Sequence, residues 1–411
     1  MQQEALLALV GCSILQLPIW GAAMTFGILQ EAYGRELDLD SSETGVIGTT
    51  MNGVIYLAMP VLFTLLDGGL LTQRRPLIAI IGVVIAATAW VASSFATTLA
   101  QLLSLQGVLA AIGTTMLYSS STMYLDERFS AGRATAYGAI LSSKNIVGTA
   151  GPLMISALIQ RIGIRWTLRV WALIVLVIGL IGFSIIPRSK SNPRTEPKPV
   201  HWGFLKHRTF WIYTIANISF SSGYGLPQTY LPSYARDVSQ LSPLLSSLVL
   251  TLFNAPGIIS CVGVGLLSDK FSFSGSMNVL LVAAGSAIFT LCLWGLGDAQ
   301  STGVLIAYAM AYGFFASAFS STWGGWIKDF EAEADRNEEI VNTGMLYGFF
   351  NGARGIGYLL GGVAGVELLK VGSVSHTGGY GTQYGGVVLF TGVSAVVGAL
   401  SVVQKCAKRV L

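Results

Sequence analysis

Two basic residues lie inside long apolar segments of the chain, where charged side chains are rare. Lys144 lies in the apolar run 134–160, and Arg354 lies in the run 342–369. A charged group at membrane depth costs roughly 2.5 kcal/mol or more, so it commonly marks a ligand or ion pathway. The lysine ammonium acts as a point charge, whereas the guanidinium offers a planar fork to a carboxylate. Together the two side chains favour binding of an anion, with contacts to backbone carbonyls and polar neighbours as the structural alternative.

The surroundings of these two cations repeat. Each cation follows a tyrosine–glycine pair after five intervening residues and precedes an isoleucine by two positions. The two copies are Tyr137, Gly138, Lys144 and Ile146, and Tyr347, Gly348, Arg354 and Ile356; every position is shifted by 210 residues. The repeat predicts two related halves that place the two cations at equivalent positions around one central site. Such a site between internal repeats is typical of transporters.

The elements that must position this site are long apolar helices. Hydrophobic residues make up 53% of the 411 residues and charged residues only 11%, whereas a soluble domain carries roughly twice that charge. A run of about 20 apolar residues is enough to cross a bilayer as a helix. We therefore predict an all-α membrane protein with twelve transmembrane helices. The predicted spans are 5–30, 44–66, 77–96, 98–124, 134–160, 167–187, 210–234, 242–267, 277–297, 302–327, 342–369 and 385–404.

A polar, proline-containing stretch divides the predicted helices into two sets of six. It carries six cations against one acid between residues 188 and 208. We predict an N-terminal six-helix half at 1–187, a basic linker at 188–209 and a C-terminal six-helix half at 210–411. Most loop cations fall on the side of the termini and linker, and the positive-inside rule then places both termini in the cytoplasm. We expect a monomer in the plasma membrane. The net charge of +4 lies in loops and does not favour a nucleic-acid partner.

Charged residues at the ends of spans suggest a gate. An acid followed by cations comes after the second span and again after the eighth, and an ion pair between helix ends at these places would hold the cytoplasmic side closed. The residues are Asp67, Arg74, Arg75, Asp269 and Lys270. The alternative is ordinary charge at helix ends. The acids that follow the first span, which include Glu31 and Glu36, are predicted to form a solvated face.

These features resemble a known family. Six plus six spans, a basic linker and two loops that are degenerate copies of a Gly-x-x-x-Asp-Arg/Lys signature resemble the major facilitator superfamily. The segments 18–21, 26–31, 134–148 and 165–169 further resemble the monocarboxylate porter family, in its fungal monocarboxylate permease-like and secondary-metabolite transporter branch. The resemblance implies two pseudo-symmetric halves and alternating access around a central cavity.

The chain departs from the animal members of that family. Those porters carry a lysine in the first span and an Asp–Arg pair four residues apart in the eighth, where this chain has Met24, Gly257 and Cys261. The resemblance therefore does not extend to proton-coupled lactate transport. No Asp or Glu lies at mid-depth in any predicted span, so protons are a candidate coupling ion only through Lys144.

Further polar and aromatic residues of the predicted spans are candidates for lining the central site. For Asn145 and Asn351 the alternative is a structural hydrogen bond to the neighbouring cation. For the others the alternative is packing between helices or anchoring at the membrane interface; they are Tyr118, Tyr224, Gln228, Asn254 and Trp323.

The sequence thus predicts a transporter of a small organic anion, monocarboxylate-like or a carboxylate-bearing metabolite, working by alternating access. One alternative remains open: efflux of a neutral or amphipathic fungal secondary metabolite, with both cations structural. A non-transporting membrane sensor is a more remote alternative. The spans lack the clustered His, Asp and Cys that intramembrane chemistry needs, so we predict no enzyme, no metal and no cofactor.

Overall fold

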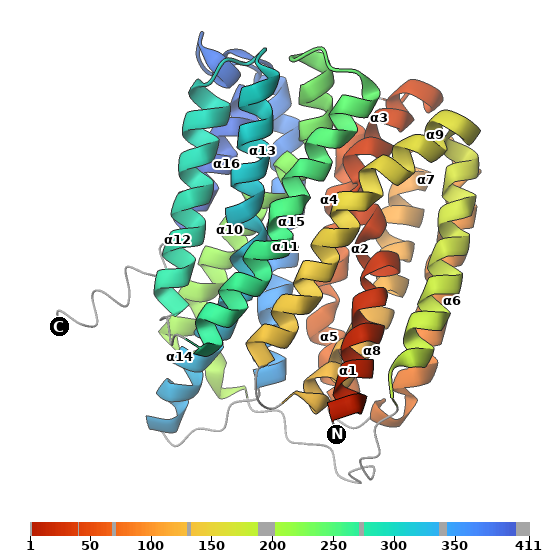
Figure 1. The fold of residues 1–411 in the computed structure, drawn as a ribbon, viewed down its shortest axis with the longest axis vertical. Helices are drawn as coiled ribbons and strands as arrows, with labels where there is room; N and C mark the ends of the chain where they lie inside the picture. Colours follow the sequence, from red (N-terminus) through yellow and green to blue (C-terminus); the bar gives the residue numbers. More distant parts are fainter. Residues whose placement is uncertain are drawn as a thin grey trace, which may run out of the picture.

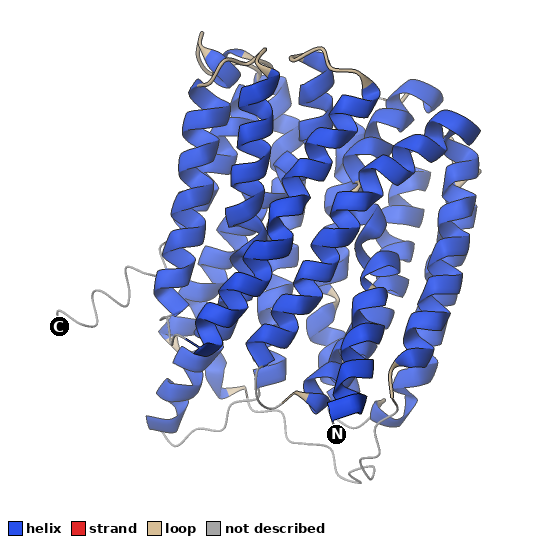
Figure 2. Cartoon of the chain, viewed as in Figure 1, coloured by secondary structure: helices blue, strands red, loops and turns tan. Residues whose placement is uncertain are grey.

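A computed structural model describes residues 2–39, 41–67, 71–129, 133–187, 202–270, 275–336 and 343–399. Figure 2 shows these residues as helices and short connections, and the described ranges hold no strand. The α-helices are α1 Gln2–Ile14, α2 Gln16–Met24, α3 Phe26–Leu37, α4 Ser41–Leu57, α5 Met59–Asp67, α6 Arg75–Ser93, α7 Leu99–Leu102, α8 Ala111–Arg128, α9 Arg133–Ile185, α10 Arg208–Asp237, α11 Pro243–Lys270, α12 Gly275–Ile288, α13 Thr302–Ser317, α14 Trp323–Arg336, α15 Thr343–Val371 and α16 Gly385–Gly398.

These helices form twelve rods in the described ranges. The rods are α1–α3, α4–α5, α6, α7–α8, the two parts of α9, α10, α11, α12 with its π-helical end η4 Phe289–Leu296, α13–α14, α15 and α16. Eight helical segments are long and apolar enough to cross a membrane, and one of them, 135–185, holds two rods. Helical rods are the expected form, because a spanning helix satisfies its own backbone groups where no water is available. The predicted all-helical membrane fold is confirmed.

The rods differ from the predicted spans at three places. The first rod extends beyond residue 30 to Leu37 as α3. The fifth and sixth spans have no loop between them, since α9 turns at Gly163, whose φ of 75° and ψ of 167° suit glycine alone. The tenth span continues as α14 to Arg336.

Helices from the two ends of the chain gather on opposite sides of the molecule. Figure 1 shows α1 to α9 on the right and α10 to α16 on the left. The two groups meet mainly along two helix pairs, α9 with α11 and α4 with α15. Glycines bring these backbones together: a Cβ on Gly138 would lie 2.9 Å from the Cys261 carbonyl oxygen, and one on Gly355 would lie 2.6 Å from that of Gly53. Small residues permit such close approach between membrane helices.

Candidate functional site

The two predicted cations lie at these two contacts. Lys144 is on α9 and Arg354 is on α15, and their side chains are 5% and 2% exposed. The Lys144 ammonium donates a hydrogen bond to the Tyr56 hydroxyl at 3.0 Å. It also lies 3.8 Å from the centroid of the Trp20 ring. Both partners come from the same half of the chain as the lysine.

Arg354 is surrounded by aromatic rings. Its Nη1 donates to Ser320 Oγ at 2.5 Å, whereas its buried Nε has no hydrogen-bond partner. The guanidinium carbon lies 4.8 to 5.9 Å from four ring centroids, those of Tyr224, Tyr56, Tyr358 and Trp323. Contacts of this kind contribute about 0.5 to 2 kcal/mol each.

Six rings make up what we call the central aromatic cluster: Trp20, Tyr56, Tyr118, Tyr224, Trp323 and Tyr358. Within it Trp20 packs on Tyr56 at 4.9 Å and on Tyr118 at 5.6 Å. Tyr56 stacks on Tyr358 at 5.7 Å with 17° between the ring planes. Because Tyr56 is on α4 and Tyr358 on α15, this stack joins the two sides of the molecule. Tyr56 also contacts both cations: its hydroxyl accepts from Lys144, and its ring lies beside the Arg354 guanidinium.

The two cations have no buried acid beside them among the described side chains. There, the buried charged residues are Arg75, Lys144 and Arg354, all of them basic. Burying a charge costs several kcal/mol unless a partner compensates it. Ring faces and hydroxyl groups compensate these two charges in part, so a ligand with negative charge would add the missing interaction.

Three of the other candidates belong to the central aromatic cluster. Tyr224 and Trp323 lie beside Arg354, and Tyr118 packs on Trp20. The four amides bond to other groups: Asn145 to Leu141 O and Cys261 Sγ, Asn254 to Gly148 O and Leu250 O, Asn351 to Tyr347 O, and Gln228 to Met24 Sδ. Asn145 and Asn254 thereby tie α9 to α11.

Sequence reasoning missed Trp20, Tyr56, Tyr358 and Ser320 as site residues. For Tyr358 a signal existed, because it follows Arg354 by four positions and so shares its helix face. Ser320 and Tyr56 carry no such signal, since the contacts that bring them to the cations join segments far apart in the sequence.

The predicted cytoplasmic gate is described only in part. Arg75 is buried and donates from Nε and Nη2 to the Leu66 carbonyl oxygen at 3.2 and 3.1 Å. It thus satisfies a carbonyl at the end of α5, where helical partners are lacking. Arg74 is exposed. The side chains of Asp67, Asp269 and Lys270 lie outside the described residues, so the proposed ion pairs stay a prediction.

An ion pair joins the two sides of the molecule at the other end. Glu31, on α3, lies 3.0 Å from Arg236 Nη1, on α10. We call this end, opposite the N-terminus in Figure 1, the distal face. Burial raises the pKa of the Glu31 carboxyl above its ordinary value, although Arg236 and Arg35 act in the opposite direction. The prediction that this acid is solvated is wrong, because α3 packs against α10.

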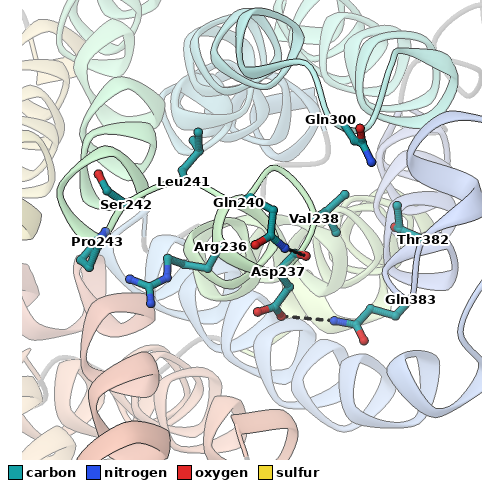
Figure 3. Close-up of a pocket in the computed structure, with 10 residues that line it drawn as sticks. All are labelled: Arg236, Asp237, Val238, Gln240, Leu241, Ser242, Pro243, Gln300, Thr382 and Gln383. Carbon is teal, nitrogen blue, oxygen red and sulfur yellow. Dashed lines mark hydrogen bonds between the residues drawn. The ribbon is translucent and has the colours of Figure 1, made fainter.

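The same face holds a wide depression of about 1040 Å³ beside Arg236 (Figure 3). Asp237 lies at its edge and accepts hydrogen bonds from Tyr384 Oη at 2.7 Å and from Gln383 Nε2 at 3.2 Å. Glu36 is exposed, as predicted, and also accepts a hydrogen bond from the Ile164 backbone amide at 2.9 Å. It therefore fixes the turn of α9 within its own half of the chain.

Comparison with known proteins extends this picture. Over 98% of its length the chain matches a crystal structure of a mutant of the nucleoside transporter NupG, with a TM-score of 0.69 and 16% identity, covering 99% of that chain. This likeness establishes the fold. Curated relatives include the "Fujikurins efflux protein" of Gibberella fujikuroi, 28% identical over 75% of this chain and 64% of that protein, and the "Agnestins efflux protein AgnL12" of Paecilomyces divaricatus, 25% identical over 78% and 72%.

The first of these relatives is matched over less than two thirds of its own length. Both are named for the export of compounds, and neither name specifies a monocarboxylate porter. The family model of the Major Facilitator Superfamily matches residues 13–330, more than half of the chain. Together with the helical fold, this match shows that the chain belongs to the Major Facilitator Superfamily.

Proposed function

We propose that this chain exports an amphipathic secondary metabolite by alternating access. The observation that carries the proposal is the position of Lys144 and Arg354 among aromatic rings, where helices from the two ends of the chain meet. Rings and cations together suit a compound with an apolar body and polar oxygen atoms. The names of the curated relatives support export over uptake of a small nutrient acid.

The proposed movement is a rocking of residues 1–187 against residues 210–411. In this structure α3 packs on α10 near the distal face, where a Cβ on Gly27 would lie 2.8 Å from the Thr229 carbonyl oxygen. The Glu31–Arg236 pair joins the same two helices. Release of substrate through the distal face requires these contacts to separate. Because an exporter releases its substrate outside the cell, we propose that the distal face is extracellular and that the termini are cytoplasmic. Rocking of this kind is the usual basis of alternating access.

Transport of a small organic anion is the second candidate. The lack of a buried carboxylate beside Lys144 and Arg354, among the described side chains, favours it. Under this proposal the anion itself neutralises the site, whereas under the first proposal the cations can also bind carbonyl or hydroxyl oxygens.

Export from a transport-deficient yeast tests both proposals. Cells are loaded with labelled organic acids or with amphipathic aromatic metabolites, and efflux is compared for the wild type, Lys144→Gln and Arg354→Gln at equal abundance in the membrane. We expect export of at least one metabolite by the wild type and a loss of about tenfold or more in Arg354→Gln, as expected when one buried charged contact is removed. Lys370→Gln is the matched control, because the Lys370 ammonium is exposed and pairs with Glu367 outside the site.

Wild-type flux in both variants would show that the cations are structural. Export of small aliphatic acids alone would favour the second candidate over the first.

A further inference from the structure

The central site holds several donors that have no acceptor. Arg354 Nε, Trp20 Nε1 and Trp323 Nε1 are buried atoms without a hydrogen-bond partner, and their side chains are 2%, 1% and 0% exposed. A buried donor left unpaired is costly. One of these donors belongs to Arg354 and the other two to rings that contact the cations, so donors and positive charge outnumber the hydroxyl acceptors of the site, such as those of Tyr56 and Ser320. A ligand with acceptor oxygens and negative charge complements it.

The ring faces restrict the shape of such a ligand. Tyr56 and Tyr358 lie nearly parallel, with 17° between their planes and 5.7 Å between their centroids. They belong to α4 and α15, so they part when the two sides of the molecule separate. A flat ring system could then occupy a tyrosine face that the partner ring covers in this structure. Aromatic pairs are favoured in this offset or near-parallel arrangement.

The surroundings of the two cations also favour a conjugated ligand. The Arg354 guanidinium lies against Tyr224 at 4.8 Å and Tyr56 at 5.3 Å, and the Lys144 ammonium lies on the Trp20 ring. An anion that enters here must lose its water among rings. An anion whose charge is spread over a conjugated system, as in a phenolate or enolate, loses less hydration free energy than a compact carboxylate does, because the cost of removing an ion from water rises as its charge is concentrated. For an aryl carboxylate, only the packing of its flat ring on the tyrosines gives such an advantage.

We propose that the site selects planar, conjugated anions, such as aryl carboxylates or the phenolates and enolates of aromatic metabolites. The ring system packs on Tyr56 and Tyr358, while the anionic oxygens accept hydrogen bonds from Arg354 and Lys144. This inference rests on the proposed export function and narrows its substrate class. It differs from the small-anion candidate because planarity, and not charge alone, sets the affinity.

Matched ligands separate planarity from charge. The purified full-length chain in detergent is titrated with 1-naphthoate, with its saturated analogue decahydronaphthalene-1-carboxylate and with neutral 1-naphthamide, and binding is followed by isothermal calorimetry. The two acids share one charge and a similar carbon skeleton, and the amide shares the flat ring. We expect 1-naphthoate to bind about tenfold more tightly than either, since stacking and charge pairing each contribute an effect of this order.

Variants assign the two effects to residues. Tyr358→Leu should abolish the preference for the flat acid, whereas Tyr358→Phe, which keeps the ring, should retain it. Arg354→Gln should abolish the preference for 1-naphthoate over 1-naphthamide. If Tyr358→Leu fails to fold, the Tyr358→Phe variant and the wild-type ligand series still give the answer.

Equal affinity for the flat and saturated acids, tighter binding of the neutral amide or no binding of 1-naphthoate would each overturn the inference. These outcomes are separate from a failure of the export proposal. A selective site in a chain that exports no metabolite would refute export alone, and export of neutral compounds by a site without this preference would refute the inference alone.

Discussion

Tyr137 and Tyr347, which are 210 positions apart at matching places in the internal repeat, pack against each other with 5.2 Å between their ring centroids. Equivalent residues of two related halves can touch only close to the axis that relates the halves. This contact therefore marks the axis between α9 and α15. Lys144 and Arg354 each follow these tyrosines by seven residues, about two helical turns. The repeat in the sequence thus corresponds to a pair of cations on either side of one axis.

Tyr56→Phe should lower the stability of the protein. The change keeps the ring but removes the hydroxyl that accepts from Lys144 at 3.0 Å, leaving a buried ammonium with fewer partners. We expect a loss of about 1 to 3 kcal/mol, measured as a lower midpoint of thermal unfolding in detergent. In a double-mutant cycle, adding Lys144→Met should recover part of this loss. Strictly additive effects of the two changes would argue against the contact.

Glu31→Lys should open the distal face more often. The change replaces the carboxylate that pairs with Arg236 across the two sides of the molecule by a cation that repels it. A cysteine introduced at Ser233, which lies on the same face near Arg236, would report opening through its rate of reaction with a membrane-impermeant maleimide. We expect a rate a few times faster, as the loss of a partly buried ion pair predicts.

Glu36→Lys is the matched control for that experiment. Its carboxylate is on the same helix but accepts from Ile164 N within one half of the chain. An equal acceleration in both variants would mean that general loosening of α3, and not the ion pair between the two sides, exposes the site.

Opening of the distal face should depend on pH. Burial raises the pKa of Glu31 in the closed arrangement above the ordinary value of 4.5, and opening returns the carboxyl to water. The closed arrangement therefore binds the proton more tightly, so this group favours closure as the pH falls through the range above 4.5. The labelling rate of a cysteine at position 233 is measured with Glu31 present and in Glu31→Gln. The ratio of the first rate to the second should fall as the pH is lowered. A flat ratio would show that Glu31 does not sense pH.

Gly313→Ala should weaken packing between α11 and α13. A Cβ at this position would overlap the Phe253 carbonyl oxygen, which is backbone and cannot rotate away. We expect a loss of about 1 to 3 kcal/mol of stability, read from thermal unfolding. Gly263→Ala serves as the control, because a Cβ there meets nothing within 4 Å. A similar loss in both variants would point to an effect on the helix itself and not on its contact.

The rods and the two cations follow from the sequence, whereas the contacts around them do not. Hydropathy is sufficient for the rods because each spanning segment must bond its own backbone. The apolar runs that contain them, together with the repeat, located Lys144 and Arg354. Tyr56, by contrast, has no counterpart in the repeat that marks it. It joins the site through contacts between α4, α9 and α15, which only the three-dimensional packing determines.

The ends of the rods were the harder part to predict. Glu31 follows the last apolar residues of the first span, so its charge suggested a solvated loop. In the structure the helix continues to Leu37 and packs on α10. The turn at Gly163 shows the opposite difference: residues 161–166 fall between two predicted spans, but the structure continues them as one helix that turns sharply at this glycine.

The pair of buried cations has an electrical consequence. With one monovalent anion bound, the site carries one positive charge less than when it is empty. If the site exports an anion and both cations keep their charge, a full cycle moves one net negative charge outward, and an inside-negative membrane voltage favours this by roughly 2.3 kcal/mol per 100 mV. Export under these conditions needs no proton gradient. In proteoliposomes at equal pH on both sides, a potassium diffusion potential that is negative on the side the anion leaves should speed transport. A potential of the opposite sign should slow it.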